Sequence, residues 1–324
     1  MDPVVGISVA RVTPSRWLLG SLMVCEKVDS PEAKPPGTLA HWQDGDGICC
    51  LRKRLIEDGE LSAGDSETDQ IHSAGVSAAT WCLGQDTIVK VHSWIEGLEM
   101  EAEKIRFVRE KAPEVPVPEV LYTWIDHELN RSFLVMKRVE GEILQKAWPK
   151  LSQSQREQIA DDVGRFCVAL AANTSTRYET VTGLPVPNER WLMDAPPESH
   201  LTWHPWFLGP LSQEGLQDYL TKMSTEPPPT IDAEFHFYHA DMGPTNIMVS
   251  HGRLSAIIDW ESAAYYPRFW LATKPLVSWA FGLERERGED PRTWENLLVQ
   301  GLGENGGFRP QDEVYRRWRD GCGK

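Results

Sequence analysis

One segment, residues 239–261, constrains the fold of this chain more than any other. It begins with His-Ala-Asp-Met-Gly-Pro-Thr-Asn over residues 239–246, and a second aspartate, Asp259, follows two isoleucines further along. Asp241 lies in a loop that contains Gly243 and Pro244, and short apolar runs that favour strands lie between Asn246 and Asp259. A kinase needs one carboxylate for the acceptor hydroxyl and two oxygen ligands for Mg²⁺. The segment therefore predicts a phosphotransfer site.

The residues between Asn246 and Asp259 predict a β-hairpin. Residues 247–249 form an apolar strand pattern, His-Gly at 251–252 is a two-residue turn candidate, and residues 254–258 form the returning strand. Such a hairpin brings Asn246 and Asp259 to the same end. Taken singly, each aspartate is more simply a turn cap or a strand end, but the combined pattern favours a functional site.

These residues resemble a known family. The segment from Phe237 to Trp270 is similar to the catalytic region of the aminoglycoside phosphotransferase and choline kinase superfamily, in its fungal-type branch of phosphotransferase enzymes. That family usually has His-Gly-Asp followed by Leu, whereas this chain has Ala240 and Met242. Both replacements are small or similar in volume. The resemblance covers residues from about 69 to about 278.

The resemblance implies a role for each matching position. Asp241 is expected to be the catalytic base, and Asn246 and Asp259 are expected to bind Mg²⁺. His239 is expected to be architectural, as a lone histidine beside a strand usually is. The resemblance also implies ATP as the phosphoryl donor and a protein-kinase-like fold.

A kinase further needs a lysine on a strand paired with a glutamate on a helix. Lys90 lies in the β-branched run Thr-Ile-Val-Lys-Val, and residues 98–110 lack proline and internal glycine, which predicts a helix. Glu101 shares the apolar face of that helix, whereas Glu103 points about half a turn away. A carboxylate on the core face needs a partner, so Lys90 and Glu101 are expected to form an ion pair. The alternative for Lys90 is a solvent-facing position on an edge strand.

Two segments are candidates for nucleotide contact. The small residues around Ser77, between Gly75 and Thr80, resemble the nucleotide loop of aminoglycoside kinases, although they also suit an ordinary turn. Met136 and Val139 belong to a predicted strand and the connector that follows it, where similar chains hold adenine. A plain core strand before a turn is compatible with the same pattern.

Composition indicates a globular enzyme of one large or two small domains. The chain has 324 residues, of which 41% are hydrophobic and 25% charged, with a formal charge of −15. This charge argues against nucleic-acid and anionic-membrane partners. Six scattered cysteines without Cys-x-x-Cys spacing predict reduced thiols and a cytoplasmic protein. No apolar run reaches the length of a membrane span. The sequence does not indicate the oligomeric state.

Clusters of proline and glycine and changes in the secondary-structure pattern divide the chain into three parts. Residues 1–60 contain a Pro-rich stretch and an Asp-Gly-Asp-Gly sequence, and are expected to form an irregular extension. Residues 61–139 alternate strand patterns with one helix and are expected to form the small lobe. Residues 140–324 are expected to form a larger helical lobe, which includes a helix capped by Ser154 and Glu157. The long irregular stretch 173–213 in that lobe is expected to be functional.

The sequence therefore predicts an α+β chain with a two-lobed protein-kinase-like fold, a small β-rich N-lobe and a larger helical C-lobe. The expected activity is ATP- and Mg²⁺-dependent phosphorylation of a hydroxyl on a small molecule, such as an aminoglycoside, choline or sugar-like acceptor. A nucleotide-binding pseudokinase and a protein kinase are the alternatives. The protein kinase is disfavoured because Trp-Glu, rather than Phe-Gly, follows Asp259.

Overall fold

The computed structural model describes residues 4–59, 69–198, 200–201, 204–284 and 290–322. The chain divides into two compact units. The β-rich unit takes in Met1–Glu96, Pro118–Val139 and Ser199–Pro205, and the helical unit takes in Gly97–Val117, Glu140–Glu198 and Trp206–Lys324.

The first sheet of the β-rich unit is built from residues that the sequence analysis assigned to an irregular extension. Its five antiparallel strands follow the order β1-β2-β3-β5-β4. The prediction for residues 1–60 is therefore wrong. The Pro-rich stretch is only the connection between the third and fourth strands, and the Asp-Gly-Asp-Gly sequence is the tight turn between the fourth and fifth. The strands are β1 (Val9–Thr13), β2 (Arg16–Leu19), β3 (Met23–Val28), β4 (Thr38–Asp44) and β5 (Gly47–Lys53).

The second sheet of this unit is also antiparallel, in the order β6-β7-β8-β10-β9. The predicted strands around Lys90 and Met136 correspond to two of its members. The strands are β6 (Gln70–Ser73), β7 (Ala78–Leu83), β8 (Thr87–Ser93), β9 (Val120–Asp126) and β10 (Arg131–Lys137).

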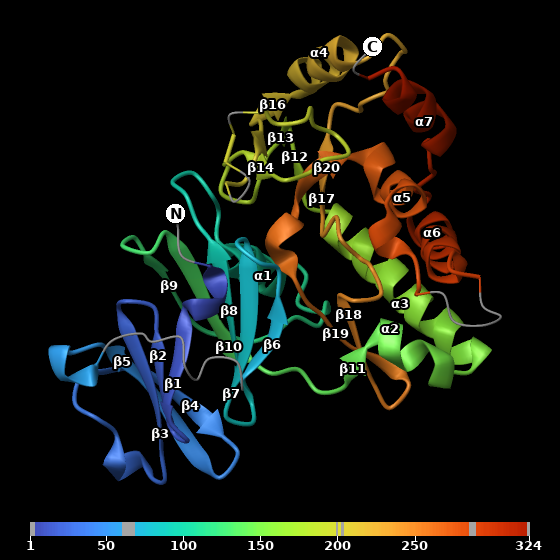
Figure 1. Ribbon diagram of the computed structural model, residues 1–324. Coiled ribbons are helices and arrows are strands. Elements are labelled where there is room, and N and C mark those ends of the chain that lie inside the picture. Colours follow the sequence, from blue (N-terminus) through green and yellow to red (C-terminus); the bar gives the residue numbers. More distant parts are fainter. Residues whose placement is uncertain (1–3, 60–68, 199, 202–203, 285–289, 323–324) are drawn as a thin grey trace. The chain divides into compact units, whose positions relative to one another are not determined.

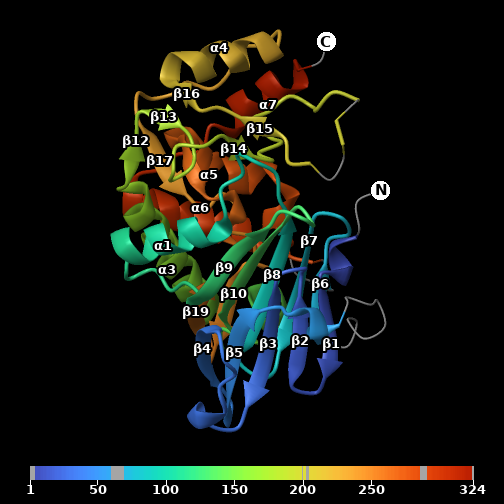
Figure 2. The same ribbon diagram turned by 90° about the vertical axis from the view of Figure 1, so that its left-hand side faces the viewer.

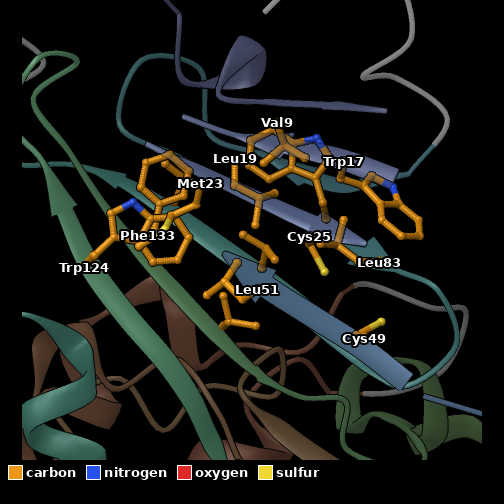
Figure 3. Packing of buried hydrophobic residues seen from close by; sticks show 14 of the residues in the cluster. Val9, Trp17, Leu19, Met23, Cys25, Cys49, Leu51, Leu83, Trp124 and Phe133 are labelled. Atoms are coloured by element: carbon orange, nitrogen blue, oxygen red, sulfur yellow. The ribbon is translucent and has the colours of Figure 1, made fainter. Parts of the chain in front are cut away.

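The two sheets pack face to face and enclose one hydrophobic core (Figure 2, Figure 3). Trp17 and Leu51 from the first sheet, and Trp81 from the second, are among its fully buried members. Trp124 stacks on its cross-strand neighbour Phe133 with ring centroids 4.6 Å apart. Each such side chain contributes about 1.5–3 kcal/mol through burial of apolar surface, so this core is the main force that joins the sheets.

The packing decides which way the side chains of β8 and β10 point. Val89, Val91 and Val135 enter the core between the sheets. Because side chains alternate along a strand, Lys90 and Met136 lie on the opposite face of the second sheet. Their strands are adjacent, with Lys90 opposite Leu134.

The helical unit contains the long helices of the chain (Figure 1). The helix predicted over residues 98–110 is α1, which begins at Glu101. The predicted capping box is wrong by two residues, because Ser152 and Gln155, rather than Ser154 and Glu157, cap the long helix α3. The helices are α1 (Glu101–Lys111), α2 (Leu144–Ala147), α3 (Gln153–Ala171), α4 (Gln213–Met223), α5 (Arg268–Val277), α6 (Thr293–Gly306) and α7 (Asp312–Asp320).

Short strands and 3₁₀ turns in the helical unit position its loops. Two three-stranded antiparallel sheets, β11-β18-β19 and β12-β17-β20, lie among the helices, and two further strand pairs are β13-β16 and β14-β15. The strands are β11 (Glu142–Ile143), β12 (Thr174–Ser175), β13 (Arg177–Tyr178), β14 (Val186–Pro187), β15 (Phe207–Leu208), β16 (Leu211–Ser212), β17 (Phe235–Tyr238), β18 (Ile247–Ser250), β19 (Arg253–Ile257) and β20 (Ala264–Pro267). The 3₁₀ turns are η1 (Val5–Ile7), η2 (Pro31–Ala33), η3 (Ile56–Asp58), η4 (Trp148–Lys150), η5 (Trp260–Ser262) and η6 (Trp279–Phe281).

Antiparallel sheets in one unit and most helices in the other confirm the predicted α+β class. Among the residues that the structure describes, no helix is both long enough and apolar enough to cross a membrane.

Candidate active site

The predicted hairpin is present and is formed by β18 and β19. Its two turn residues, His251 and Gly252, have φ of 50° and 72°, and positive φ at both positions is what a tight two-residue hairpin turn requires. The backbone N–H of Ile258 donates to the carbonyl of Asn246 at 3.0 Å. The hairpin therefore brings Asn246 and the residue before Asp259 side by side, as predicted.

Asp241 is held by the side chain of Asn246. The Nδ2 group of Asn246 donates to Oδ2 of Asp241 at 2.8 Å and to the Asp241 carbonyl at 2.9 Å. Asn246 is buried, and its own backbone N–H closes the loop by donating to Gly243 at 3.0 Å. These bonds fix one carboxylate oxygen of Asp241. Among the described residues, no hydrogen bond to its other oxygen is recorded.

His239 orients this loop through two hydrogen bonds of its ring. The backbone N–H of Asp241 donates to Nδ1 of His239 at 3.2 Å, so Nδ1 carries no proton. The proton of the neutral ring is then on Nε2, which donates to the carbonyl of Ile258 at 2.9 Å. The ring meets Trp260 edge-on at 4.6 Å between centroids. His239 thus links the start of the loop to the end of the hairpin, which is the architectural geometry expected for it.

The surroundings of Asp241 change its affinity for protons. Burial raises the pKa of this carboxyl from 3.8 to about 6, because the charged form loses solvation. The Lys274 ammonium and the hydrogen bond from Asn246 oppose the rise, whereas the negative charges of Asp259 and Glu261 add to it. A carboxylate with a pKa of about 6 is still mostly ionised at neutral pH and is a better proton acceptor than an ordinary aspartate.

Asp259 has a backbone conformation that few residues adopt. Its φ is 65° and its ψ is 61°, the left-handed region that aspartate tolerates better than most side chains. The chain turns here from β19 into η5. The next residue, Trp260, is fully buried, and its indole N–H donates to Ile257 at 2.9 Å. The Trp260 ring therefore belongs to the core and cannot line an acceptor site.

Helix α1 fixes this turn from its N-terminal end. The carboxylate of Glu101 accepts a hydrogen bond from the backbone N–H of Trp260 at 2.9 Å, and Lys104 donates to the carbonyl of Glu261. Glu101 is buried, while Glu103 lies at the surface and pairs with Arg106 at 2.6 Å. The predicted inward orientation of Glu101 is confirmed. Its ion pair with Lys90 stays a prediction, since Lys90 belongs to the other unit.

The remaining candidate residues lie in the β-rich unit. Lys90 and Met136 share one face of the second sheet, and Val139 lies in the connector just after β10. Ser77 lies in the turn between β6 and β7, where its hydroxyl donates to the carbonyl of Ala74 at 2.9 Å. The structure therefore brings Lys90 and Met136 to one surface, and places Ser77 in a small loop at the end of the neighbouring hairpin.

Sequence reasoning missed a buried ion pair near Asp241. The ammonium of Lys274, in α5, lies 2.6 Å from Oε2 of Glu189, with side chains that are 8% and 1% exposed. A lysine inside an apolar helix pattern at residues 269–276 was the available signal. Glu189 lies in the long irregular stretch that was expected to be functional, but no sequence pattern joins it to Lys274.

Two contacts from the C-terminal part of the chain also support residues 239–246, the predicted catalytic loop. The indole N–H of Trp294, in α6, donates to the carbonyl of Met242 at 3.0 Å. Gly243 lies directly against the carbonyl of Ala280, and a side chain at position 243 would collide with it. These contacts surround Asp241 with fixed backbone, and they depend on residues far away in the sequence.

Comparison with known proteins identifies the family. Residues 69–270 match the model of the phosphotransferase enzyme family, APH. This match spans more than half of the chain, so the chain belongs to that family and is a small-molecule phosphotransferase. The match includes Lys90 and Glu101 as well as the whole hairpin site. It confirms the predicted family and, together with the β-rich and helical units, the predicted protein-kinase-like fold.

Several solved structures are similar to this chain. A thermostable mutant of aminoglycoside phosphotransferase APH(4)-Ia in its apo form is 18% identical, with 77% of this chain and 83% of that chain covered and a TM-score of 0.46. Aminoglycoside-3'-phosphotransferase of type VIII is 17% identical, with 76% and 88% covered and a TM-score of 0.46. The streptomycin–ATP–APH(2")-IIa ternary complex is 14% identical, with 77% and 80% covered and a TM-score of 0.48. No curated protein matches the chain.

Proposed function

We propose that this phosphotransferase transfers the terminal phosphoryl group of ATP, bound with Mg²⁺, to a hydroxyl group of a small molecule. One observation carries the proposal. The carboxylate of Asp241 is held at one oxygen by Asn246, at the end of the hairpin that also carries Asp259. Family membership supplies the reaction class.

In this proposal Asp241 is the catalytic base. Asn246 holds Oδ2, and Oδ1 is left to accept the hydrogen bond of the acceptor hydroxyl. The raised pKa of Asp241 suits this role, because the carboxylate stays ionised at neutral pH and yet takes up a proton readily. The bonds from Asn246 and His239 keep the carboxylate in one orientation, which is the main requirement for phosphoryl transfer.

Asn246 and Asp259 suit Mg²⁺ in their chemistry. The Nδ2 group of Asn246 is used on Asp241, so its amide oxygen is the atom left to bind a cation. Magnesium takes hard oxygen ligands and commonly uses only one or two protein groups, with the rest supplied by phosphates and water. In keeping with this, the part of the chain that the structure describes holds no cluster of three or more His, Cys, Asp or Glu side chains suited to a metal. When bound, Mg²⁺ would neutralise charge on the phosphates.

The nucleotide is proposed to bind with its phosphates near Lys90, which Glu101 would orient, and with its adenine near Met136 and Val139. The turn that carries Ser77 would cover the phosphates with backbone N–H groups. Support comes from the β-rich unit, where Lys90 and Met136 lie on the same face of one sheet. The acceptor is proposed to be a hydroxylated small molecule of the aminoglycoside, choline or sugar class.

The test uses Asp241→Asn, which is nearly isosteric. We expect turnover with ATP and Mg²⁺ to fall by roughly two to four orders of magnitude, the usual contribution of a general base. Affinity for ATP should stay within about twofold, because Asp241 faces the acceptor rather than the phosphates. Asp218→Asn, at an exposed position on α4, is the matched control and should keep full activity.

The measurement is ATP turnover against a panel of aminoglycosides, choline-like amines and sugars, with water as the default acceptor. Equal turnover rates in the Asp241→Asn variant and the unmodified protein would rule out Asp241 as the catalytic base. Tight Mg²⁺-dependent ATP binding without turnover of any acceptor would favour the nucleotide-binding pseudokinase instead. Phosphorylation of proteins alone would favour a protein kinase.

A further inference from the structure

Burial of the Lys274–Glu189 ion pair costs free energy, because its hydrogen bonding is incomplete. Both side chains are almost fully buried, with the charged atoms 2.6 Å apart. The second carboxylate oxygen of Glu189 is buried without a hydrogen-bond partner among the described residues, and so is the hydroxyl of Tyr178. Buried ion pairs with incomplete hydrogen bonding contribute little stability, and well-packed apolar residues often replace them without loss. Stability alone therefore does not account for the pair.

The pair lies next to the catalytic loop. The carbonyl of Lys274 accepts a hydrogen bond from the N–H of Ser278 at 2.9 Å, where α5 ends. Two residues later, the carbonyl of Ala280 lies against Gly243 of the catalytic loop. Helix α5 also packs on β17, the strand that leads into that loop. The last turn of α5 thus faces the loop that carries Asp241.

Charge and surroundings indicate what Lys274 does there. Burial raises the pKa of Asp241, and the charge of the Lys274 ammonium opposes that rise. The other charged groups that influence Asp241 are the carboxylates of Asp259 and Glu261. Burial and the charge of Glu189 raise the pKa of Tyr178, Tyr238, Tyr266 and Tyr315, and buried side chains of this kind screen charge less than water does. Lys274 is therefore a fixed positive charge that attracts the Asp241 carboxylate, whereas the carboxylates of Asp259 and Glu261 repel it.

We infer that Lys274, fixed by Glu189, is a positioning residue that anchors the last turn of α5 against the catalytic loop and so keeps the carboxylate of Asp241 in its reactive orientation. This inference rests on the proposed role of Asp241 as the base. Asn246 holds one oxygen of the carboxylate by a hydrogen bond, and the turn that follows α5 covers Gly243 of the same loop. The positive charge of Lys274 opposes the repulsion from Asp259 and Glu261.

The test removes the pair as a whole, because Lys274→Met alone would leave Glu189 buried without a partner. The double variant Lys274→Met/Glu189→Met replaces both groups by apolar side chains, and we expect its melting temperature to equal or exceed that of the unmodified protein. In Mg·ATP hydrolysis with water as acceptor, we expect kcat to fall at least about tenfold while KM for Mg·ATP stays within about twofold. Lys274→Arg, which keeps charge and pairing, should recover most of the loss.

A third measurement separates positioning from a general structural effect. If Lys274 acts through Asp241, adding Lys274→Met/Glu189→Met to Asp241→Asn should lower kcat no further, because the group that is positioned has already been removed. A folded double variant with unchanged kcat would overturn the inference, and so would additive losses. Asp241→Asn alone, in the same assay, tests the proposed function, so a failure of one is distinguishable from a failure of the other.

Discussion

Asp58 provides the sharpest stability prediction. Its carboxylate accepts two hydrogen bonds from the guanidinium of Arg52, both at 2.7 Å, and one from the backbone N–H of Leu55 at 2.6 Å. Arg16 also donates to it, and the Asp58 side chain is only 1% exposed. These bonds tie η3 to strands β2 and β5 of the first sheet. Replacing Asp58 by Asn keeps the shape but removes the charge that both arginines need.

The pKa of Asp58 gives the expected magnitude. The hydrogen bonds from Arg52, followed by that from Leu55 and the charges of Arg52 and Arg16, lower this pKa from 3.8 to about 2 despite burial. At about 1.4 kcal/mol for each pKa unit, the difference corresponds to roughly 2 kcal/mol of stability. Because the folded-state pKa is the lower one, this stability is fully present above pH 4–5 and is lost as the pH falls through about 2.

We therefore expect Asp58→Asn to lose roughly 2 kcal/mol at pH 7 and less than about 0.5 kcal/mol at pH 2. Since the chain has two compact units, the measurement is hydrogen exchange of the slowest amides in β3 and β5, between pH 7 and pH 2. Asp46→Asn is the matched control, because Asp46 is 96% exposed in the same sheet. A difference that is below about 0.5 kcal/mol at pH 7, or that does not shrink with acid, would refute this reasoning.

Two further predictions concern the metal site and a helix contact. In calorimetry, Asp259→Asn should abolish the Mg²⁺-dependent tightening of ATP binding, while ATP binding in EDTA is retained. Asparagine also tolerates the φ of 65° at this position, so the variant should fold. An unchanged effect of Mg²⁺ on ATP binding in the folded variant would disprove the metal role. Gly164→Ala should lower stability by about 1–3 kcal/mol, because its Cβ would lie 2.9 Å from the backbone of Gly301 in α6. Gly303→Ala is the control, because its Cβ would lie 3.7 Å from the nearest atom, the Phe308 carbonyl oxygen, and it should raise stability by up to about 1 kcal/mol. Equal melting temperatures for the Gly164→Ala and Gly303→Ala variants would contradict the packing argument.

Local patterns were sufficient to predict the hairpin and the polar groups at its end. A two-residue turn at His251 and Gly252 has few possible geometries, and the alternation of the strands then fixes which residues meet. The same holds for Glu101, whose orientation follows from the period of the helix. These features depend on residues within about fifteen positions of one another, so the sequence alone carries them.

Alternation could not reveal the first sheet because two of its strands, β2 and β5, bury side chains on both faces. Residues 17–19 are an apolar run in which Leu18 is buried as well as its neighbours, so no alternation marks the strand. Cys49, Cys50 and Leu51 show the same pattern in β5. The partner of this sheet is the second sheet, whose first strand begins at Gln70. Only the packing between the sheets reveals that the early residues are folded.

Ala240 was judged by size alone, and the structure shows why size is the wrong measure. Its φ is 64°, a left-handed conformation that glycine adopts without strain and alanine adopts at a cost of about 1–2 kcal/mol. This strained residue directly precedes Asp241, so some other interaction must hold the loop. Sequence gave no sign of this, because backbone dihedrals at one position depend on the contacts around it.

Four residues make contacts around this loop, and these contacts explain how the backbone strain at Ala240 is maintained. His239 links the loop to Ile258, Asn246 holds the Asp241 side chain, Trp294 binds the Met242 carbonyl, and Ala280 covers Gly243. Three of these are hydrogen bonds, each contributing about 0.5–1.5 kcal/mol, so together they offset the strain at Ala240. A loop held in this way cannot relax toward a more comfortable backbone. The carboxylate of Asp241 therefore keeps one position, and a strained residue beside it is the expected consequence of fixing a reactive group by its backbone.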